Sequence, residues 1–329
     1  MCFARYSAMS NEIIALGSLV VDITARAARA PLPGESLIGA GFGIFTGGKG
    51  LNQAVAAARS GAVLHMIGKV GDDEFAPRFF AALAAEHIDA AFVKRDAAQS
   101  TGVALITVLT GSGQNTIVVN PNANLAVTEE DVLELFRTLN PSGGVFITQC
   151  ETSQVSYSAG LRAAKAFGLE TVWNIAPVPS DPLPDELFAL ADYLFVNEVE
   201  AALLTDMPAD TPETARTAGI ELLHKGARNV FVTLGAKGVV WLRLDAAGHP
   251  ESWWMRAFPV AQVDATAAGD AMCGVFAAQI AAGTGVASAL RRAVAAGALA
   301  VTRMGALPSI PAATEIDSFL AQFAAPFVL

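Results

Sequence analysis

The stretch Val263-Asp264-Ala265-Thr266-Ala267-Ala268-Gly269-Asp270 leads directly into an apolar run that predicts a helix over residues 271–282. Small residues at 267–269 allow an anion to approach the free amides at a helix N-terminus, where the helix dipole also favours negative charge. Asp270 would then face both a bound phosphate and an incoming hydroxyl group. This arrangement predicts phosphoryl transfer with Asp270 as the base, although Asp264 or Asp270 could instead simply cap the helix.

On either side of this stretch, short β-branched runs alternate with longer alanine-rich runs. Strands are predicted over residues 12–22, 63–69, 145–148, 170–173, 193–196 and 229–233. Helices are predicted over residues 50–60, 75–86, 153–167, 198–204 and 212–225, and Thr128 opens another. Strands separated by helices are typical of parallel βαβ units. The predicted fold class is therefore α/β, a three-layer sandwich whose central, mostly parallel sheet is covered by helices.

Two regions interrupt this alternation. Residues 24–45 are rich in glycine and proline, and residues 101–120 predict a hairpin with strands at 102–109 and 115–120, joined by Thr110-Gly111-Ser112-Gly113. Both regions are interpreted as strands of a small sheet that forms a lid. The predicted organisation is a core of residues 12–23, 46–99 and 121–329, a discontinuous lid of residues 24–45 and 100–120, and a disordered extension of residues 1–11.

The bulk composition argues against several classes of protein. Of the 329 residues, 53% are hydrophobic and 16% are charged, which is enough apolar material for a large core. The most apolar segment, residues 271–301, is interrupted by polar residues and glycine, so it predicts two buried helices and not a membrane span of about 20 residues. A net charge of −10 argues against nucleic acid or membrane partners. Three scattered cysteines and the lack of a signal peptide indicate a cytoplasmic location.

The segment Gly43-Ile44-Phe45-Thr46-Gly47-Gly48-Lys49-Gly50 resembles a Walker-type phosphate loop. That loop requires Ser or Thr after its lysine, because the hydroxyl group holds Mg²⁺, and here the position is Gly50. A glycine-rich turn between a strand and a helix, as in dinucleotide-binding folds, is also missing from the sequence. Neither common nucleotide-binding motif therefore explains this chain.

Four further positions or segments could bind ligands. Asn197-Glu198-Val199-Glu200 lies where a predicted strand meets a helix, so a carboxylate there could hold Mg²⁺ through water, or be an ordinary solvated first turn. Thr233-Leu234-Gly235-Ala236-Lys237-Gly238 is a strand-turn-strand that could approach a nucleotide, or be only a turn. Asp22 and Glu151 each follow or end an apolar strand and could bind sugar hydroxyl groups, or be rim charges.

Taken together, these segments resemble the ribokinase-like pfkB family of carbohydrate kinases, over residues 13–323. The segments that carry the resemblance occur in the family's order: Gly17-Ser18 with Asp22, Gly47-Gly48-Lys49-Gly50-Leu51-Asn52-Gln53-Ala54, residues 68–75, residues 100–106, residues 197–200, residues 233–238, residues 264–270 and residues 300–309. The resemblance implies an ATP- and Mg²⁺-dependent kinase that acts on a terminal CH₂OH group of a small sugar. D-ribose is the first candidate for that sugar. It also implies activation by K⁺, and a lid that forms a homodimer contact.

The resemblance also implies a role for each matching residue. Asp270 is the expected base, and the amides of Ala267, Ala268 and Gly269 form the expected anion hole. The expected sugar contacts are Asp22, Gly48, Lys49, Asn52 and Glu151. The expected ATP contacts are Asn197, Thr233, Gly235 and Gly238, with Glu200 holding Mg²⁺ through water. The expected K⁺ loop contains Asp264, Thr266, Gly305 and Ser309.

Three positions differ from the ribokinase pattern. Val20 stands where ribokinases usually carry Asn, Ala265 where the family usually has Thr, and Leu51 where ribokinases often have a smaller residue. Losing the amide at position 20 removes a hydroxyl partner worth about 1–3 kcal/mol. An apolar Val20 would suit a nucleoside or a deoxygenated sugar, so a nucleoside kinase or another pfkB-type kinase stays an alternative to ribokinase. A non-catalytic sugar or nucleotide sensor on the same fold is the second alternative.

Overall fold

The computed structural model describes residues 11–111 and 115–323. The predicted N-terminal extension, apart from Asn11, lies outside the described residues, as do Ser112 and Gly113 of the predicted hairpin turn. The described strands form two sheets. The large sheet contains β1 (Glu12–Leu16), β4 (Val63–Gly71), β5 (Asp89–Asp96), β8 (Val145–Thr148), β9 (Glu170–Asn174), β10 (Tyr193–Asn197), β11 (Asn229–Thr233), β12 (Val239–Leu244) and β13 (Pro250–Met255).

The order across the large sheet is β13-β12-β11-β10-β9-β8-β1-β4-β5. Neighbours from β11 to β5 run parallel, whereas β12 and β13 are antiparallel additions at one edge. No strand is predicted from the sequence at β5 or β13, which form the two edges. β5 mixes buried and exposed positions without regular alternation, so its sequence carries no clear period of two.

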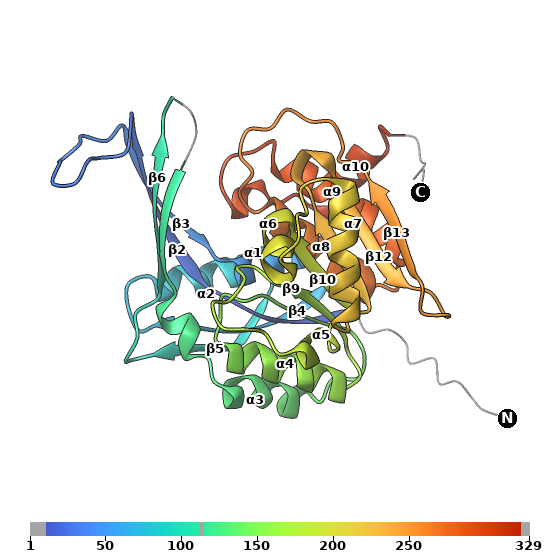
Figure 1. Ribbon diagram of the computed structural model, residues 1–329. Coiled ribbons are helices and arrows are strands. Elements are labelled where there is room, and N and C mark those ends of the chain that lie inside the picture. The colour runs from blue at the N-terminus through green and yellow to red at the C-terminus, as the bar shows by residue number, and fades with distance from the viewer. Residues whose placement is uncertain (1–10, 112–114, 324–329) are drawn as a thin grey trace.

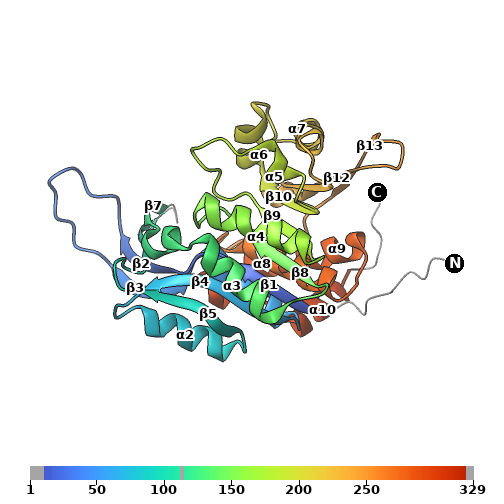
Figure 2. The same ribbon diagram turned by 90° about the horizontal axis from the view of Figure 1, so that it is seen from below.

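Helices cover both faces of this sheet, as Figures 1 and 2 show from two directions. One face is covered by α1 (Lys49–Arg59), α2 (Ala76–Ala85), α8 (Ala268–Ala281), α9 (Val286–Ala300) and α10 (Ala313–Leu320). The other is covered by α3 (Glu129–Leu139), α4 (Gln154–Ala166), α5 (Asp185–Phe188), α6 (Glu198–Thr205) and α7 (Pro212–His224). Along β1, Ile13 and Ala15 pack into one apolar cluster and Ile14 and Leu16 into the other, because successive side chains point to opposite faces. The predicted three-layer α/β fold is confirmed.

The strand predicted over residues 12–22 is wrong in extent. β1 ends at Leu16, and β2 (Val20–Ala27) starts the second sheet. Between them, the backbone N–H and C=O of Leu19 pair with the side chain of Asn124 and not with a strand. A Cβ at Gly17 would lie 2.5 Å from Gly50 Cα, so this link passes directly against the start of α1. The hydrophobic pattern does not encode that close approach.

The helix predicted over residues 271–282 begins earlier than expected, at Ala268. A Cβ added at Gly274 of this helix would lie 2.2 Å from the backbone oxygen of Gln53 in α1. Glycine at this position therefore lets α8 approach α1 more closely than any other residue would. The close approach places Asp270, in the first turn of α8, beside the first turns of α1.

The second sheet contains the residues predicted to form a lid, and it projects from the body of the molecule (Figure 1). Its order is β3-β2-β6-β7, with β3 (Gly41–Gly47), β6 (Gly102–Leu109) and β7 (Asn115–Asn120). The last two strands have the bounds that the hairpin pattern predicts. β2 and β3 extend across the predicted core and lid boundaries at residues 23 and 46, so Asp22 lies on a strand of the small sheet.

The order of strands in the large sheet reverses at β1, which lies between β4 and β8. In open parallel sheets, ligands bind outside the carboxyl ends of the strands at such a point. Ser18 follows β1 and Glu151 follows β8, so both lie at this edge of the sheet. Among the described residues, no helix is long and apolar enough to cross a bilayer.

Candidate active site

The N-terminus of α8 has the geometry of an anion site. Ala267, the residue before the helix, has φ 60° and ψ 8°, a left-handed conformation that costs a non-glycine residue about 1–2 kcal/mol. This turn presents the first amides of α8, which have no carbonyl partner within the helix. A Cβ at Gly269 would meet no atom within 4 Å, so the approach to these amides is open.

Asp270 is almost fully buried, and both of its carboxylate oxygens accept hydrogen bonds from α1. Asn52 Nδ2 donates to Oδ2 at 3.0 Å, and Gln53 Nε2 donates to Oδ1 at 3.0 Å. A buried carboxylate is unstable without such partners. The two amides therefore hold the carboxylate of Asp270 at the mouth of the anion site.

A cluster of charges surrounds this carboxylate. Glu151 Oε2 accepts the backbone N–H of Lys49 at 3.0 Å and the hydroxyl group of Ser18, and so stabilises the start of α1. Burial, with the charges of Glu151 and Asp270, raises the pKa of Asp22 to about 6. Burial opposes the charged form of Lys49, but the nearby anions, Asp270 first, raise its pKa overall, so its ammonium stays charged.

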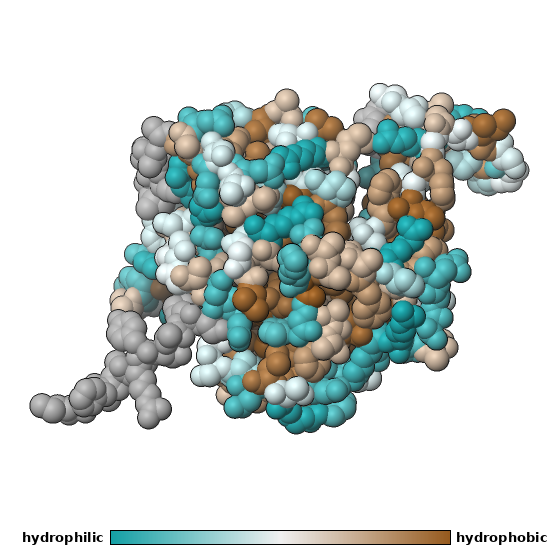
Figure 3. Space-filling model, turned by 180° about the vertical axis from the view of Figure 1, so that it is seen from behind, coloured by the Kyte–Doolittle hydropathy of each residue, from teal (hydrophilic) through white to brown (hydrophobic). Residues whose placement is uncertain are grey.

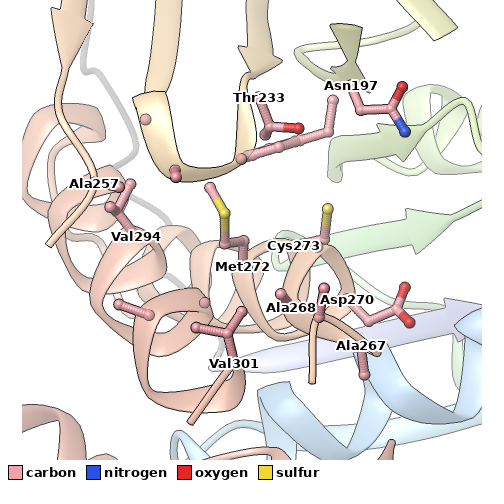
Figure 4. Close-up of a pocket in the computed structure, with 18 of the residues that line it drawn as sticks. Asn197, Thr233, Ala257, Ala267, Ala268, Asp270, Met272, Cys273, Val294 and Val301 are labelled. Carbon is pink, nitrogen blue, oxygen red and sulfur yellow. The ribbon is translucent and has the colours of Figure 1, made fainter. Parts of the chain in front are cut away.

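A cavity of about 570 Å³ lies between the carboxyl end of the large sheet and α8. Its polar end contains Lys49, Asn197, Glu200 and Asp270, and Figure 4 shows Asp270 and Asn197 on opposite sides of it. The rest of the wall is largely apolar and comes from α8, α9 and the turn after β11. Its members include Ala236, Ala257, Phe258, Pro259, Val260, Met272, Val294, Ala298 and Val301. The volume and the mixed lining suit a ligand with one apolar and one anionic end.

Asn197 and Glu200 form a capping box at the start of α6. Asn197 Oδ1 accepts the backbone N–H of Glu200 at 2.8 Å, and Glu200 Oε2 accepts the backbone N–H of Asn197 at 2.7 Å. Burial raises the pKa of Glu200. The box leaves the second carboxylate oxygen of Glu200 available toward the cavity that both residues line. The sequence allowed this segment to be an ordinary solvated first turn. In the structure its two polar residues cap α6 and also line the cavity.

The turn after β11 brings Thr233, Gly235 and Gly238 to the cavity wall. A Cβ at Gly238, which has φ 105°, would lie 1.9 Å from the backbone oxygen of Met255 on β13. Glycine at this position lets β12 begin directly against β13. The backbone of this turn thereby forms the rim of the apolar part of the cavity.

The loop before α8 is tied to the loop after α9. Asp264 Oδ1 accepts the hydroxyl group and the backbone N–H of Thr266, at 2.6 and 2.9 Å, and Oδ2 accepts the backbone N–H of Gly305 at 2.9 Å. Burial alone would raise the pKa of Asp264, but these hydrogen bonds lower it. Ser309 is fully buried and donates to the backbone oxygen of Ala306 at 2.7 Å. The expected K⁺-loop residues thus lie on two connected loops.

The structure brings most of the expected site residues to one place. Lys49, Asn197, Glu200, Thr233, Gly235, Gly238, Ala267, Ala268, Gly269 and Asp270 line the cavity. Asp22, Gly48, Asn52 and Glu151 lie outside its lining, around Asp270 and the start of α1. Asp264, Thr266, Gly305 and Ser309 lie behind the anion site, outside the lining of the cavity.

Sequence patterns did not reveal the apolar wall or the polar groups beneath Asp270. The wall residues look like ordinary core residues in a sequence that is 53% hydrophobic. Gln53, Gln149 and Asn174 are buried and linked by hydrogen bonds, with Gln53 in contact with Asp270. Of these three residues, only Gln53 lies within one of the motifs named above. For Gln149 and Asn174, the sequence signal is a polar residue at the end of a buried strand.

Comparison with known proteins agrees with this geometry. Residues 10–313 match the pfkB family of carbohydrate kinases. A deoxyribokinase of Salmonella typhi is 33% identical over 309 residues, which cover 94% of this chain and 98% of the relative. A ribokinase of Staphylococcus aureus is 34% identical over 311 residues, which cover 94% and 99%.

Solved structures show the same fold. The structure of Arabidopsis thaliana ribokinase complexed with ribose and ATP matches with a TM-score of 0.85 at 29% identity, covering 96% of this chain and 100% of that one. Ribokinase from Thermotoga maritima matches with a TM-score of 0.81 at 31% identity, covering 94% and 99%. With an active-site geometry that fits and a match over nearly its whole length, the chain belongs to the pfkB family of carbohydrate kinases.

Proposed function

We propose that this kinase transfers the γ-phosphoryl group of ATP to the terminal primary hydroxyl of D-ribose or a closely related small sugar. The observation that carries the proposal is the position of Asp270, whose buried carboxylate is held by α1 where the polar end of the cavity meets Asp22 and Glu151. Asp22, Gly48, Lys49, Asn52 and Glu151 hold the sugar beyond Asp270. A ribokinase with ribose and ATP bound has the same fold.

ATP lies in the cavity with its base toward the apolar wall and its phosphates toward α8. Thr233, Gly235 and Gly238 line the apolar part, and Asn197 lies toward the phosphates. The amides of Ala267–Gly269 stabilise the charge of the transferring phosphoryl group. Asp270 orients the sugar hydroxyl and accepts its proton as the new P–O bond forms, while the bond between the γ-phosphorus and the β-phosphate oxygen breaks and ADP leaves. The transition state of such transfers is loose, so positioning and charge stabilisation supply most of the rate enhancement.

The charges of the site favour a divalent cation with the nucleotide. Glu151, Glu200 and Asp270 lie around the ammonium group of Lys49. Asp22 adds a further carboxylate beside Glu151 and Asp270. A polyphosphate added to this set would be repelled unless cations came with it. Glu200 lines the polar end of the cavity and fits the role of holding Mg²⁺ through water. The metal would supply charge neutralisation between the phosphates.

K⁺ would bind beside the anion site, between the loop of Asp264 and Thr266 and the loop of Gly305 and Ser309. The donors there are oxygen atoms of Asp264, of Thr266 and of the backbone, which suit a hard monovalent cation. Asp264 already joins the two loops through Gly305, so an ion would reinforce a connection that exists without it. Its effect on catalysis would be indirect, through the geometry of Ala267–Gly269.

Val20 makes 2-deoxyribose a second candidate substrate. It lies two residues before Asp22 on β2, so both side chains leave the same face of that strand. The side chain is 5% exposed and offers no hydrogen-bond partner to a sugar hydroxyl. A sugar that lacks the hydroxyl loses nothing at this position, and a relative with 33% identity is a deoxyribokinase.

The lid exposes apolar side chains that a second copy of the chain would cover. Phe42 on β3 is 73% exposed, and Val118 on β7 is 61% exposed. Figure 3 shows apolar residues on this projecting sheet, among polar ones. An exposed apolar patch of this kind is typical of an interaction surface. We therefore propose a homodimer through the lid.

A cytoplasmic location stays a prediction, consistent with the use of ATP.

The substrate proposal is tested by ADP release with Mg-ATP and K⁺ across ribose, 2-deoxyribose, fructose, other pentoses and nucleosides. We expect ribose and 2-deoxyribose to give the highest kcat/KM. Turnover with a nucleoside alone would contradict the small-sugar proposal and support a nucleoside kinase. No turnover with any compound would favour a sensor.

Replacing Asp22 by Asn should weaken sugar binding but stabilise the folded protein. The carboxylate is a strong partner for sugar hydroxyls, so we expect the sugar KM to rise about tenfold or more while the ATP KM changes little. The pKa of Asp22 is about 6 in the folded protein and 3.8 for an ordinary aspartate, so Asp22 binds protons more tightly in the folded state. Its ionisation therefore lowers the stability of the protein as the pH rises from about 4 to 6. At pH 7.5 the variant should therefore be more stable by roughly 1–3 kcal/mol. An unchanged sugar KM, or a less stable variant, would refute this assignment.

Replacing K⁺ by Na⁺ at constant ionic strength should lower kcat several-fold, because the smaller ion fits the oxygens of the two loops poorly. A choline salt serves as the control for ionic strength. Equal rates in all three salts would mean that Ala265 marks the loss of the cation site.

The dimer is tested by light scattering on the wild type and on Phe42→Glu. We expect the wild type to have twice the mass of the chain and the variant to shift toward the monomer. Leu203→Glu, on α6 of the body and 64% exposed in the wild type, is the matched control and should stay dimeric. A monomeric wild type would contradict the proposed homodimer.

A further inference from the structure

The proposed mechanism gives Gln53 no part beyond its hydrogen bond to Asp270. Gln53, in the second turn of α1, is fully buried, so it cannot contact a sugar in the site. Its Nε2 donates to Asp270 Oδ1 at 3.0 Å and to Asn174 Oδ1 at 3.1 Å, and its Oε1 accepts from Gln149 Nε2 at 2.7 Å. All of its amide protons and its oxygen are therefore engaged.

The orientation of the Gln53 amide is determined by backbone groups of the large sheet. Asn174, at the end of β9, donates from Nδ2 to the backbone oxygen of Phe195 at 3.1 Å, which leaves Asn174 Oδ1 as an acceptor facing Gln53. Reversing the Gln53 amide would place its oxygen against two other oxygens, those of Asp270 and Asn174. It would also set its NH₂ group against that of Gln149. Only the observed orientation satisfies both amide protons and the oxygen of Gln53.

Asn52 and Gln53 thus differ in role although both donate to Asp270. Asn52 Oδ1 is buried and has no hydrogen-bond partner within the described residues, so Asn52 keeps an unused acceptor. Gln53 has no capacity left for a ligand. Its only link to the reaction is Asp270 Oδ1.

We infer that Gln53 is a positioning residue, which fixes the carboxylate of Asp270 through a hydrogen-bonded chain from Phe195 through Asn174. Gln149 supports this orientation by donating to the side-chain oxygen of Gln53 from the other side. The chain connects the sheet to α8, so that the base keeps its orientation when the sugar and ATP enter. The inference rests on the proposed role of Asp270 as the base.

A double-mutant cycle tests it. Gln53→Met keeps the side-chain length and removes the donor to Asp270, so kcat should fall about tenfold while the sugar and ATP KM stay within about twofold. In the Asp270→Asn background the same substitution should lower the residual kcat by less than about twofold, because there is no base left to position. Gln149→Met should give a smaller loss of kcat than Gln53→Met.

Gln279→Met is the matched control, because Gln279 lies at the far end of α8 and its side chain accepts only from Thr284 among the described hydrogen bonds. Its kcat should equal that of the wild type. A Gln53→Met enzyme with wild-type kcat, or with an equal fold loss in both backgrounds, would overturn the inference and leave the proposed base intact. If Asp270→Asn alone kept wild-type turnover, the proposed function of Asp270 would fail first.

Discussion

The site depends on how closely α1 packs against α8. This approach requires glycine at two places: Gly274, whose Cβ would lie 2.2 Å from Gln53 O, and Gly50, whose Cβ would lie 2.3 Å from the backbone carbon of Gly17. The first contact joins the two helices, and the second joins α1 to the end of β1. Because of these two contacts, the carboxylate of Asp270 lies against the side-chain amides of Asn52 and Gln53 on α1. All three lie at the edge of the sheet where the strand order reverses. A methyl group at either position would push Asp270 away from the residues around it.

The same packing concentrates negative charge. Asp22, with a pKa of about 6, shows what burial beside other carboxylates costs, because its charged form is less stable in the folded protein than in the unfolded chain. Lys49 and the N-terminus of α8 offset only part of this charge. Under the proposed function, the carboxylates that would bind sugar hydroxyls and cations are also the groups that lower the stability of the fold.

Much of the molecule could be predicted from the sequence, for definite reasons. The hairpin strands β6 and β7 have clear turn residues between them, and the Val263–Asp270 stretch has the small residues and carboxylate of an anion site. The break between β1 and β2 was missed because it results from the contact of Gly17 with Gly50, far apart in sequence. The apolar cavity wall was missed because its residues resemble core residues. The network through Gln149 and Asn174 was missed because only the fold brings together the ends of β8 and β9 with α1.

The proposed mechanism requires Asp270 to accept the proton of the sugar hydroxyl. The most direct test is the single-turnover rate of sugar phosphorylation by Asp270→Asn, with ATP binding measured in parallel by titration. We expect a loss of about 10²–10⁴-fold in rate with nearly unchanged ATP affinity. A rate within about threefold of the wild type would contradict it, and would move the base to another carboxylate of the cluster.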